Sequence, residues 1–374
     1  MTRWVRTPDE LSHLGRALAG SGTVALDTES DSLYHHVEKV CLVQIADDKG
    51  EACLVDPLVL KNLSPLAPVM ADPAVVKVLH GADYDVTTLK RDFGFRFAGL
   101  FDTMIAARFL GRPQIGLQAM AQAELGVALS KDSQRDDWSR RPLTATQEAY
   151  ALADVTHLLA LYARLREELR GLGRLDWVLE ESDAVAALEP ARRARDPESY
   201  LRIKGSRRLS RRAQAVLREV HAWREDLAET TDVPAFKLLS SEALLAMAER
   251  PPRATAEVAK VRGLSPRVKG RAGELLAAIE RALALPDSEL ARPSPPPTRP
   301  VVSDAARKNI ERLRAWRARE ATRLGVDISV VLPQRLLERL AQVAPTNAEG
   351  LGQVEGLRRW RVAAFGPDLL RTIA

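Results

Sequence analysis

The sequence has little of what secreted or membrane proteins contain. Only two of its 374 residues are cysteines, Cys41 and Cys53, too few for a disulfide framework or a four-cysteine zinc site. No apolar run approaches the roughly 20 residues that span a bilayer, and the first ten residues lack the apolar core of a signal peptide. We therefore expect a cytoplasmic protein in which both thiols are buried.

Positive charge is scarce in the first half of the chain. Residues 1–190 contain 20 Lys and Arg against 28 Asp and Glu, a net charge of −8. Residues 191–374 contain 35 against 22, a net charge of +13, so the overall value of +5 hides a large difference. A basic half suggests a polyanionic partner. The alternative is a solvated surface that is rich in arginine.

Strand and helix patterns alternate only in the first half. We expect helices near 60–70, over 83–92 and over 146–170, and strands at 23–27, 40–46, 52–55, 75–80 and near residue 100. The second and third strands are joined only by the turn-like residues 47–50, which favours an antiparallel pair. The pattern predicts an α/β domain with a mixed sheet.

Strand patterns disappear in the second half, which reads as two helical repeats. An offset of 93 residues places Trp223-Arg224 on Trp316-Arg317 and Gly263-Leu264 on Gly356-Leu357. Equal spacing of these pairs and of the apolar positions between them predicts a duplicated helical domain. We expect an α/β domain over 1–190, a basic connector over 191–206, repeats over 207–286 and 303–374, and a proline-rich linker over 287–302.

Two acidic residues stand at the end of the first apolar strand pattern. Asp27 and Glu29 are two positions apart, so their side chains would lie on the same side of a strand. Two neighbouring carboxylates repel each other unless a cation lies between them, and hard divalent ions prefer such oxygen ligands. Taken alone, the pair is also consistent with a solvated strand end.

A further carboxylate follows a glycine turn. Residues 78–85 predict a strand end, a turn at Gly81 and the start of a helix. Asp85 would lie in the first helical turn, where a carboxylate also interacts favourably with the helix dipole. Asp83 is the better candidate for the N-cap. His80 could contact a phosphate, although a hydrogen-bonded structural histidine is the alternative.

Tyr150 and Asp154 complete the set of candidate residues. They are four positions apart in a helical pattern, so the phenol and the carboxylate would share one helix face. A tyrosine at the edge of the core beside an exposed aspartate is the alternative. The functional interpretation depends on all three elements occurring in this order within one α/β domain.

These residues resemble the motifs of the DEDD exonucleases, in their Tyr-containing branch and within it the ribonuclease D family. Asp27-Thr-Glu29 resembles the first motif, His80-Gly-Ala-Asp-Tyr-Asp85 the second, and Tyr150-Ala-x-x-Asp154 the third. Residues 101–103 and 138–143 also look like the family. The two helical repeats resemble HRDC domains, which are small nucleic-acid-binding modules. The resemblance implies a ribonuclease H-like α/β nuclease domain with a mixed sheet, followed by two all-α HRDC domains.

The resemblance also implies a mechanism. Asp27, Glu29, Asp85 and Asp154 would bind two divalent ions, Mg²⁺ or Mn²⁺, since zinc prefers His and Cys ligands. Tyr150 would orient the attacking water. The activity implied is 3′–5′ hydrolysis of RNA to nucleoside 5′-monophosphates, with tRNA precursors as the expected substrates. We expect a monomer that needs no nucleotide cofactor and no membrane.

The most concentrated run of positive charge covers residues 192–212, from the connector into the start of the first repeat. We expect it to contact RNA phosphates, together with His80, although a solvated connector is the alternative. The candidate residues are Arg202, Lys204, Arg207, Arg208, Arg211 and Arg212. Trp223 and Trp316 could stack on bases, but their place within helices favours core packing.

Two other functions fit parts of the pattern. A 3′–5′ DNA exonuclease would need the same carboxylates, and the paired HRDC-like repeats favour RNA over DNA. A catalytically inactive RNA-binding scaffold would be expected to lack a metal ligand, and all four carboxylates are present. A helicase is disfavoured because the sequence lacks a G-x-x-x-x-G-K-[ST] phosphate loop.

Overall fold

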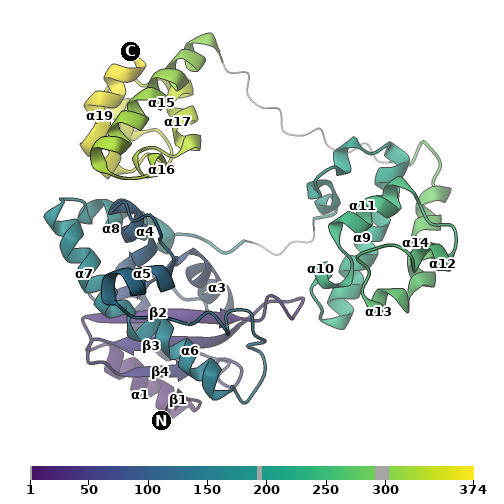
Figure 1. Ribbon diagram of the computed structural model, residues 1–374, viewed down its shortest axis with the longest axis horizontal. Helices are drawn as coiled ribbons and strands as arrows, with labels where there is room; N and C mark the ends of the chain where they lie inside the picture. Colours follow the sequence, from purple (N-terminus) through teal and green to yellow (C-terminus); the bar gives the residue numbers. More distant parts are fainter. Residues whose placement is uncertain (1, 192–195, 291–302) are drawn as a thin grey trace. The chain divides into compact units, whose positions relative to one another are not determined.

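The computed structural model describes residues 2–191, 196–290 and 303–374 (Figure 1). The chain forms two compact units. The first contains residues 1–30, 40–191 and 300–374, and the second contains residues 31–39 and 192–299. No helix in the described ranges is both long enough and apolar enough to cross a membrane.

A six-stranded mixed sheet forms the centre of the first unit. Its spatial order is β1-β4-β3-β2-β5-β6. β3 is antiparallel to β2 and β4, whereas β5 is parallel to β2 and β6, and β1 is parallel to β4. The strands are β1 (Arg3–Val5), β2 (Thr23–Ser30), β3 (Val40–Asp47), β4 (Ala52–Val55), β5 (Val76–Leu79) and β6 (Leu100–Asp102). The predicted mixed sheet is confirmed, with β1 as an additional strand.

Helices cover both faces of this sheet. Val24 and Leu26 of β2 pack on one side with apolar residues of α1 (Pro8–Leu18) and α3 (Asp83–Phe93). On the other side, α6 (Ala145–Thr156) contacts β2, β3 and β4, and α7 (Leu158–Gly171) contacts β2 and β5. The alternation along β2 therefore directs its acidic residues toward the side that α6 covers.

Two of the predicted helices differ from the structure. The single helix expected over 146–170 is divided at His157; both parts contact β2, but α6 extends over β3 and β4 and α7 over β5. The helix expected over 60–70 is a 3₁₀ turn, Ser64–Leu66, followed by the short α2, Ala67–Ala71. Pro65 and Pro68 lack backbone donors, so a continuous helix through them would lose hydrogen bonds. The first unit also contains α4 (Thr103–Phe109), α5 (Leu117–Leu125) and α8 (Leu175–Ala186).

The two helical repeats share an internal scaffold at the predicted offset. Arg224 donates to the carbonyl of Leu239 at 3.3 Å, and Arg317 donates to that of Leu332 at 2.9 Å. The first repeat consists of α9 (Arg211–Thr231), α10 (Ala235–Leu238), α11 (Ser241–Glu249), α12 (Thr255–Val258), α13 (Pro266–Lys269) and α14 (Ala272–Ala284). The second consists of α15 (Asp304–Leu324), α16 (Ile328–Val331), α17 (Gln334–Val343), α18 (Ala348–Gly352) and α19 (Arg359–Ile373).

Backbone and core positions are duplicated as well. Gly263 and Gly356 both have a φ of +85°, a conformation that side chains with a Cβ rarely adopt. Trp316 is buried and its ring lies 5.6 Å from that of Phe365, while Trp223 is half-buried against the core of the first repeat. Both tryptophans are therefore packing residues in this structure.

The second repeat packs against α8 within the first unit. The rings of Trp177 and Trp360 are stacked with their centroids 4.6 Å apart. Glu181 accepts hydrogen bonds from Trp360 Nε1 at 3.0 Å and from Arg361 at 2.5 Å. Glu180 accepts from the backbone N–H of Trp360 at the start of α19. The first repeat has Arg267 and Val268 at the positions of Trp360 and Arg361. It therefore lacks both side chains that contact α8 in the second repeat.

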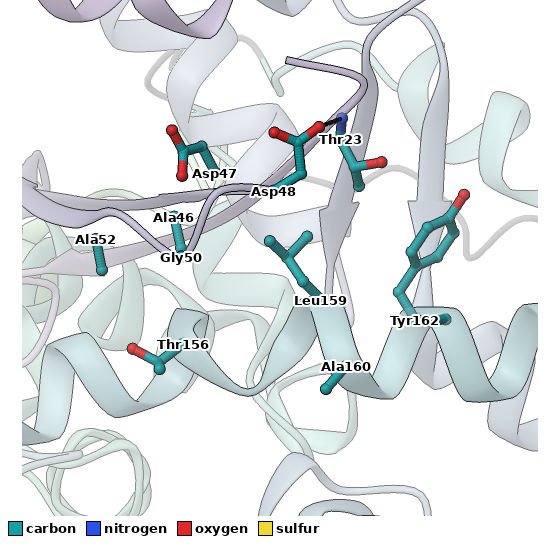
Figure 2. A pocket seen from close by; sticks show the side chains of 11 residues that line it. Thr23, Ala46, Asp47, Asp48, Gly50, Ala52, Thr156, Leu159, Ala160 and Tyr162 are labelled. Atoms are coloured by element: carbon teal, nitrogen blue, oxygen red, sulfur yellow. Dashed lines mark hydrogen bonds between the residues drawn. The ribbon is translucent and has the colours of Figure 1, made fainter.

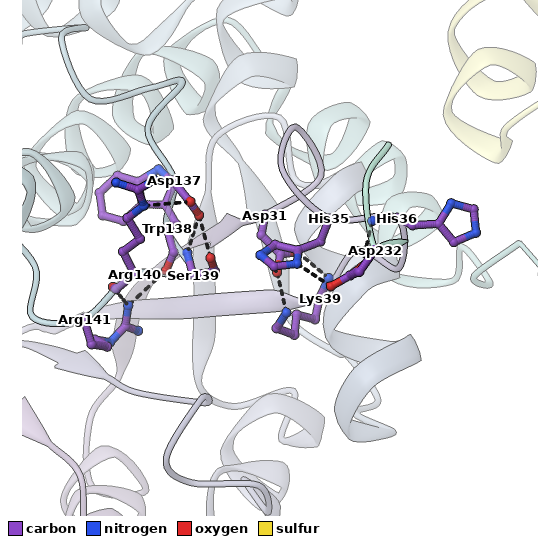
Figure 3. A network of polar contacts seen from close by, with 10 residues as sticks. All are labelled: Asp31, His35, His36, Lys39, Asp137, Trp138, Ser139, Arg140, Arg141 and Asp232. Atoms are coloured by element: carbon purple, nitrogen blue, oxygen red, sulfur yellow. Dashed lines mark hydrogen bonds and ion pairs between the residues drawn. The ribbon is translucent and has the colours of Figure 1, made fainter. Parts of the chain in front are cut away.

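The loop between β2 and β3 is part of the second unit. His35 Nδ1 lies 2.6 Å from Asp232 Oδ2 at the end of α9, and the same carboxylate accepts from the backbone N–H of His36 (Figure 3). Lys237 lies 4.1 Å above the ring of Tyr34. These contacts attach residues 31–39 to the first helical repeat.

Candidate active site

Three carboxylates converge at the end of β2. Asp27 and Glu29 project from one face of this strand, and Asp154 reaches them from α6. Each offers an oxygen atom, and these oxygen atoms all lie within 4.8 Å of one another. An all-oxygen group of this size matches the ligands that Mg²⁺ and Mn²⁺ prefer. The cluster can therefore hold a divalent cation.

The cluster opens onto a cleft of about 850 Å³. Tyr150 and His80 line it beside the three carboxylates. The remaining wall combines apolar with uncharged polar side chains, and Lys131 is the one lysine or arginine among the described residues that line the cleft. That wall contains Gln114, Gln118, Gln122, Ser130 and Gln134. A polymer end could therefore approach the carboxylates along a surface that can donate and accept hydrogen bonds.

Burial raises the pKa of each carboxyl in the cluster, and repulsion from neighbouring carboxylates raises those of Asp27 and Glu29 further. Burial is the main cause at Asp27, where the neighbouring Asp85, Asp154 and Glu29 raise the pKa further. Glu29 is raised to about 9 by burial and by the other acidic groups. Asp154 is raised to about 7 by burial, and a hydrogen bond from Tyr150 opposes that shift. Without a cation the cluster favours protons, so a bound cation would ionise it.

Asp85 lies next to this cluster but outside it. It is buried in the first turn of α3, and its Oδ1 accepts a hydrogen bond from the hydroxyl of Thr28 at 2.5 Å. Burial raises its pKa to about 7, although the Thr28 hydrogen bond lowers it. Asp85 is close enough to raise the pKa of Asp27. The structure therefore brings together the four carboxylates that the sequence singled out, three in direct proximity and one behind them.

The start of α3 is capped differently from the prediction. The N-cap residue is Ala82, and no side chain of α3 caps the helix, so the assignment of Asp83 as N-cap is wrong. Asp102 of β6 accepts hydrogen bonds from the backbone N–H groups of Gly81 at 3.0 Å and Ala82 at 2.9 Å. It thereby fixes the turn that presents Asp85. The turn is therefore held by a residue of a neighbouring strand, and Asp102 itself caps α4, not α3.

His80 is held at the edge of the cleft as a neutral ring. Its Nδ1 lies 2.9 Å from the hydroxyl of Thr103, which in turn donates to the carbonyl of Leu79. Burial lowers the pKa of His80, and the nearby Asp102 only partly opposes this shift. A neutral imidazole can form a hydrogen bond with a substrate but offers no positive charge to a phosphate.

Tyr150 is kept protonated beside Asp154. Burial and the carboxylates of Asp154, Glu29 and Asp27 raise the pKa of its phenol, so the hydroxyl remains a hydrogen-bond donor. Its ring lies 6.0 Å from that of Trp138. The helix face shared by Tyr150 and Asp154 is thus directed into the cleft, as the spacing of four residues predicted.

The segment before α6 is anchored by an arginine. Arg141 donates to both carboxylate oxygens of Asp56, at 2.7 and 2.9 Å, and to the carbonyl of Cys41 at 2.7 Å. Figure 3 shows Arg141 beside Trp138 and Asp137, and Asp137 accepts a hydrogen bond from Ser139. These contacts attach the segment to β3 and to the residue that follows β4. They fix the start of the helix that supplies Tyr150 and Asp154.

The predicted RNA-binding residues lie in different surroundings. Arg202, Lys204, Arg207 and Arg208 are exposed, and Arg202 also pairs with Asp196 at 2.7 Å. Arg211 and Arg212 instead donate to carbonyl groups of Leu290 and Leu285 beyond α14. These two arginines tie the ends of the first repeat together. Residues 192–195 of the basic stretch lie outside the described ranges.

A second cavity, of about 390 Å³, lies on the same domain (Figure 2). Leu159, Ala160 and Tyr162 of α7 line it together with the turn between β3 and β4. The carboxylate of Asp48 at its edge already accepts hydrogen bonds from the backbone N–H groups of Gly22 and Thr23. None of the candidate catalytic residues reaches this cavity, so the cleft at Asp27 is the candidate active site.

Family models match both parts of the chain. A model described as a 3′–5′ exonuclease matches residues 2–170, and an HRDC domain model matches residues 213–279 and 307–373. Ribonuclease D of Pseudomonas paraeruginosa is 34% identical over 379 residues, which cover 99% of this chain and 97% of that protein. Ribonuclease D of Gluconacetobacter diazotrophicus is 38% identical over 77% of this chain and 74% of its own length.

Solved structures show the same similarity. Escherichia coli RNase D, described as an exoribonuclease involved in structured RNA processing, superposes with a TM-score of 0.70 at 26% identity, covering 100% of this chain and 98% of that one. The catalytic core of RRP6 from Trypanosoma brucei superposes with a TM-score of 0.69 at 31% identity, covering 76% of this chain and 81% of that one. The chain therefore belongs to the ribonuclease D family of 3′–5′ exoribonucleases.

Proposed function

We propose that Asp27, Glu29, Asp85 and Asp154 bind two divalent metal ions, and that the site removes nucleoside 5′-monophosphates from the 3′ end of RNA. The observation that carries this proposal is the grouping of four carboxyls, three half-buried and Asp85 buried, whose pKa values are all raised. Such a group is unfavourable unless protons or cations neutralise it. A catalytic metal site accounts for its presence in an open cleft.

The donor set favours Mg²⁺ or Mn²⁺ over zinc. All four side chains offer oxygen, and no cysteine or histidine belongs to the cluster. Bound ions would lower the pKa of a coordinated water and neutralise the charge that develops on the phosphate. Asp27, near the other three carboxylates, would contact both ions, while Glu29 and Asp154 would hold one and Asp85 would act on the side of the other.

Tyr150 would position the attacking water. Its phenol remains protonated because burial and the surrounding carboxylates raise its pKa. The hydroxyl can therefore donate a hydrogen bond but cannot act as a base near neutral pH. Its role is orientation, and proton removal depends on the metal-bound form of the site. His80, as a neutral ring, would hydrogen-bond the terminal nucleotide.

We propose RNA with a free 3′ end as the substrate and tRNA precursors as its physiological form. What supports this is the relative from Escherichia coli, which is described as acting in structured RNA processing. The exposed Arg202, Lys204, Arg207 and Arg208 would contact phosphates, since released counterions favour such contacts. Arg211 and Arg212 contribute less, because they are engaged with backbone carbonyls. A monomeric state and a cytoplasmic location remain predictions.

The proposal is tested with matched RNA and DNA oligomers that carry a label at the 5′ end. With Mg²⁺, the RNA should shorten one nucleotide at a time from the 3′ end, and a 3′-phosphate block should stop it. The DNA oligomer should be degraded more slowly. Equal or faster degradation of the DNA would instead support a DNA exonuclease. Internal cleavage products would contradict the exonuclease proposal altogether.

A further inference from the structure

Gln44 is a buried polar residue on the strand that pairs with the candidate metal-binding strand. It lies in the middle of β3, and its side chain is fully buried, with an exposed fraction of 0%. Within the part of the chain that the structure describes, neither the amide nitrogen nor the amide oxygen has a hydrogen-bond partner. Its neighbours in β3 are apolar, so the glutamine interrupts a continuous hydrophobic strand.

The register of the sheet places Gln44 beside Asp27. The two residues are directly opposite each other in the antiparallel pair of β2 and β3. Opposed residues point to the same face, and their Cβ atoms lie about 4.5–5.5 Å apart. Gln44 is also opposite Leu54 of β4, and Leu54 belongs to the apolar cluster that Tyr150 adjoins. The amide is therefore enclosed beneath the active site, between Asp27 and an apolar wall.

A second buried donor without a partner lies in the apolar cluster that contains Leu54. Trp138 Nε1 is buried and has no partner among the described residues. The Trp138 ring packs beside Tyr150, which faces the carboxylates. Two polar groups with unused hydrogen-bonding capacity thus lie behind the same face of the site. Because two such groups occur together, the unpaired amide of Gln44 is not an isolated exception, and both groups are available for hydrogen bonds to the site.

The energetics argue against a purely structural role for the Gln44 amide. A buried donor or acceptor without a partner destabilises the folded protein, and an apolar side chain of the same shape would avoid that destabilisation. The register places the Asp27 carboxylate, a potential acceptor that also interacts with the backbone of Thr28, directly across the strand pair. Hydrogen bonds from an amide to an ionised carboxylate are stronger than neutral ones.

We propose that Gln44 is a positioning residue whose amide N–H donates to the Asp27 carboxylate when divalent ions occupy the cluster. The contact would hold Asp27 in the orientation that metal binding requires, as hydrogen bonds to metal-ligating carboxylates do in other sites. This inference rests on the proposed metal site and adds to it a residue that orients a metal ligand without binding the metal itself. It assigns Gln44 no contact with the substrate.

Titration of the metal-free protein with Mn²⁺ in a calorimeter, without RNA, tests the proposal. Gln44→Met keeps the length of the side chain and removes both polar atoms. The variant should bind Mn²⁺ about 10- to 100-fold more weakly than the wild type. Its thermal unfolding temperature without metal should be unchanged or higher, because an unpaired amide has been removed. If the amide only stabilised the fold, Gln44→Met would bind Mn²⁺ as the wild type does and would unfold at a lower temperature.

Gln214 offers a matched control in the first repeat. It is also buried, but its Nε2 donates to the carbonyl of Ser206 at 3.2 Å. Gln214→Met should lower the unfolding temperature and leave the Mn²⁺ affinity unchanged. If the Mn²⁺ affinities of Gln44→Met and the wild type agree within twofold, the positioning role is wrong. Loss of folding in both Gln44→Met and Gln44→Leu would also overturn it. Failure of the wild type to bind Mn²⁺ would instead refute the proposed metal site.

Discussion

The catalytic domain and the first helical repeat use charge in opposite ways. The domain gathers oxygen atoms of Asp27, Glu29 and Asp154 within 4.8 Å of one another and half-buries their side chains. The stretch that leads into the first repeat leaves Arg202 and Arg208 exposed to solvent. Buried like charges need a counterion, whereas exposed charges cost little and attract a polyanion at long range. The comparison supports the proposal that the acidic half carries out the chemistry and the basic half binds RNA.

The two repeats extend this comparison, because they share a scaffold and differ on the surface. Arg224 and Arg317 make equivalent hydrogen bonds to carbonyl groups. Only the second repeat has Trp360, which stacks on Trp177 of α8. A duplicated fold can therefore keep its internal contacts while one copy becomes an integral part of the catalytic unit. The other copy remains available for a separate role.

The largest expected effect comes from the acidic half. Asp27→Asn should lower single-turnover hydrolysis by at least about a thousandfold, since bound metal ions supply several kcal/mol of transition-state stabilisation. RNA affinity should change by less than about twofold, because the basic half is intact. Quench-flow rates at saturating RNA and fluorescence anisotropy measure the two quantities. Turnover at the wild-type rate would refute the role of Asp27.

The second prediction separates the two repeats. Trp360→Ala should lower the free energy of unfolding of the catalytic unit by about 3 kcal/mol, as the loss of a large buried side chain usually does. The equivalent position of the first repeat is Arg267, and Arg267→Ala should change stability by less than about 0.5 kcal/mol. Differential scanning calorimetry distinguishes the outcomes. Equal effects would show that the second repeat is not integrated with α8.

The third prediction concerns the basic stretch. Replacing Arg202, Lys204, Arg207 and Arg208 with alanine should weaken RNA binding about 10- to 100-fold and reduce the salt dependence, with a slope change of about 0.7 per lost contact. The control removes the same charge from exposed positions of the second repeat, Lys308, Arg312, Arg314 and Arg319. If the control weakens binding as much as the first variant, charge alone determines affinity and the location of the basic residues does not.

The smallest expected effect is a pH dependence of the metal-free protein. The pKa of Glu29 is raised to about 9, and those of Asp85 and Asp154 to about 7. A carboxyl with a raised pKa stabilises the folded state below its unfolded pKa, and this contribution is lost as the pH rises through the folded value. The unfolding temperature should therefore fall between about pH 5 and pH 9, and Mg²⁺ should restore it. A constant unfolding temperature would contradict the raised pKa values.

Sequence patterns predicted the features that depend on local spacing. The strand periodicity of Asp27 and Glu29 and the helical spacing of Tyr150 and Asp154 each determine a local geometry. The mixed sheet followed from the short turn between two strands. The fold class could therefore be stated before the structure was known.

Features that depend on distant contacts could not be predicted in this way. Asp102 holds the turn before α3, some 20 residues earlier in the chain, and this role appears only when β5 and β6 pair. Trp360 shows its partner, Trp177, only in the folded unit. Gln44 looks like a chance polar residue in an apolar strand until the register places it beside Asp27. Each of these depends on sheet register or domain packing, which local periodicity does not encode.

The number of metal ions bound at the acidic cluster tests the central claim most directly. Chelator-treated wild type should be inactive on RNA, bind two Mn²⁺ ions per chain in a calorimetric titration, and recover stepwise 3′-end shortening as the second site fills. Asp154→Asn should lose at least one ion and the activity together. Shortening of RNA by the wild type in the continued presence of a chelator would contradict the account.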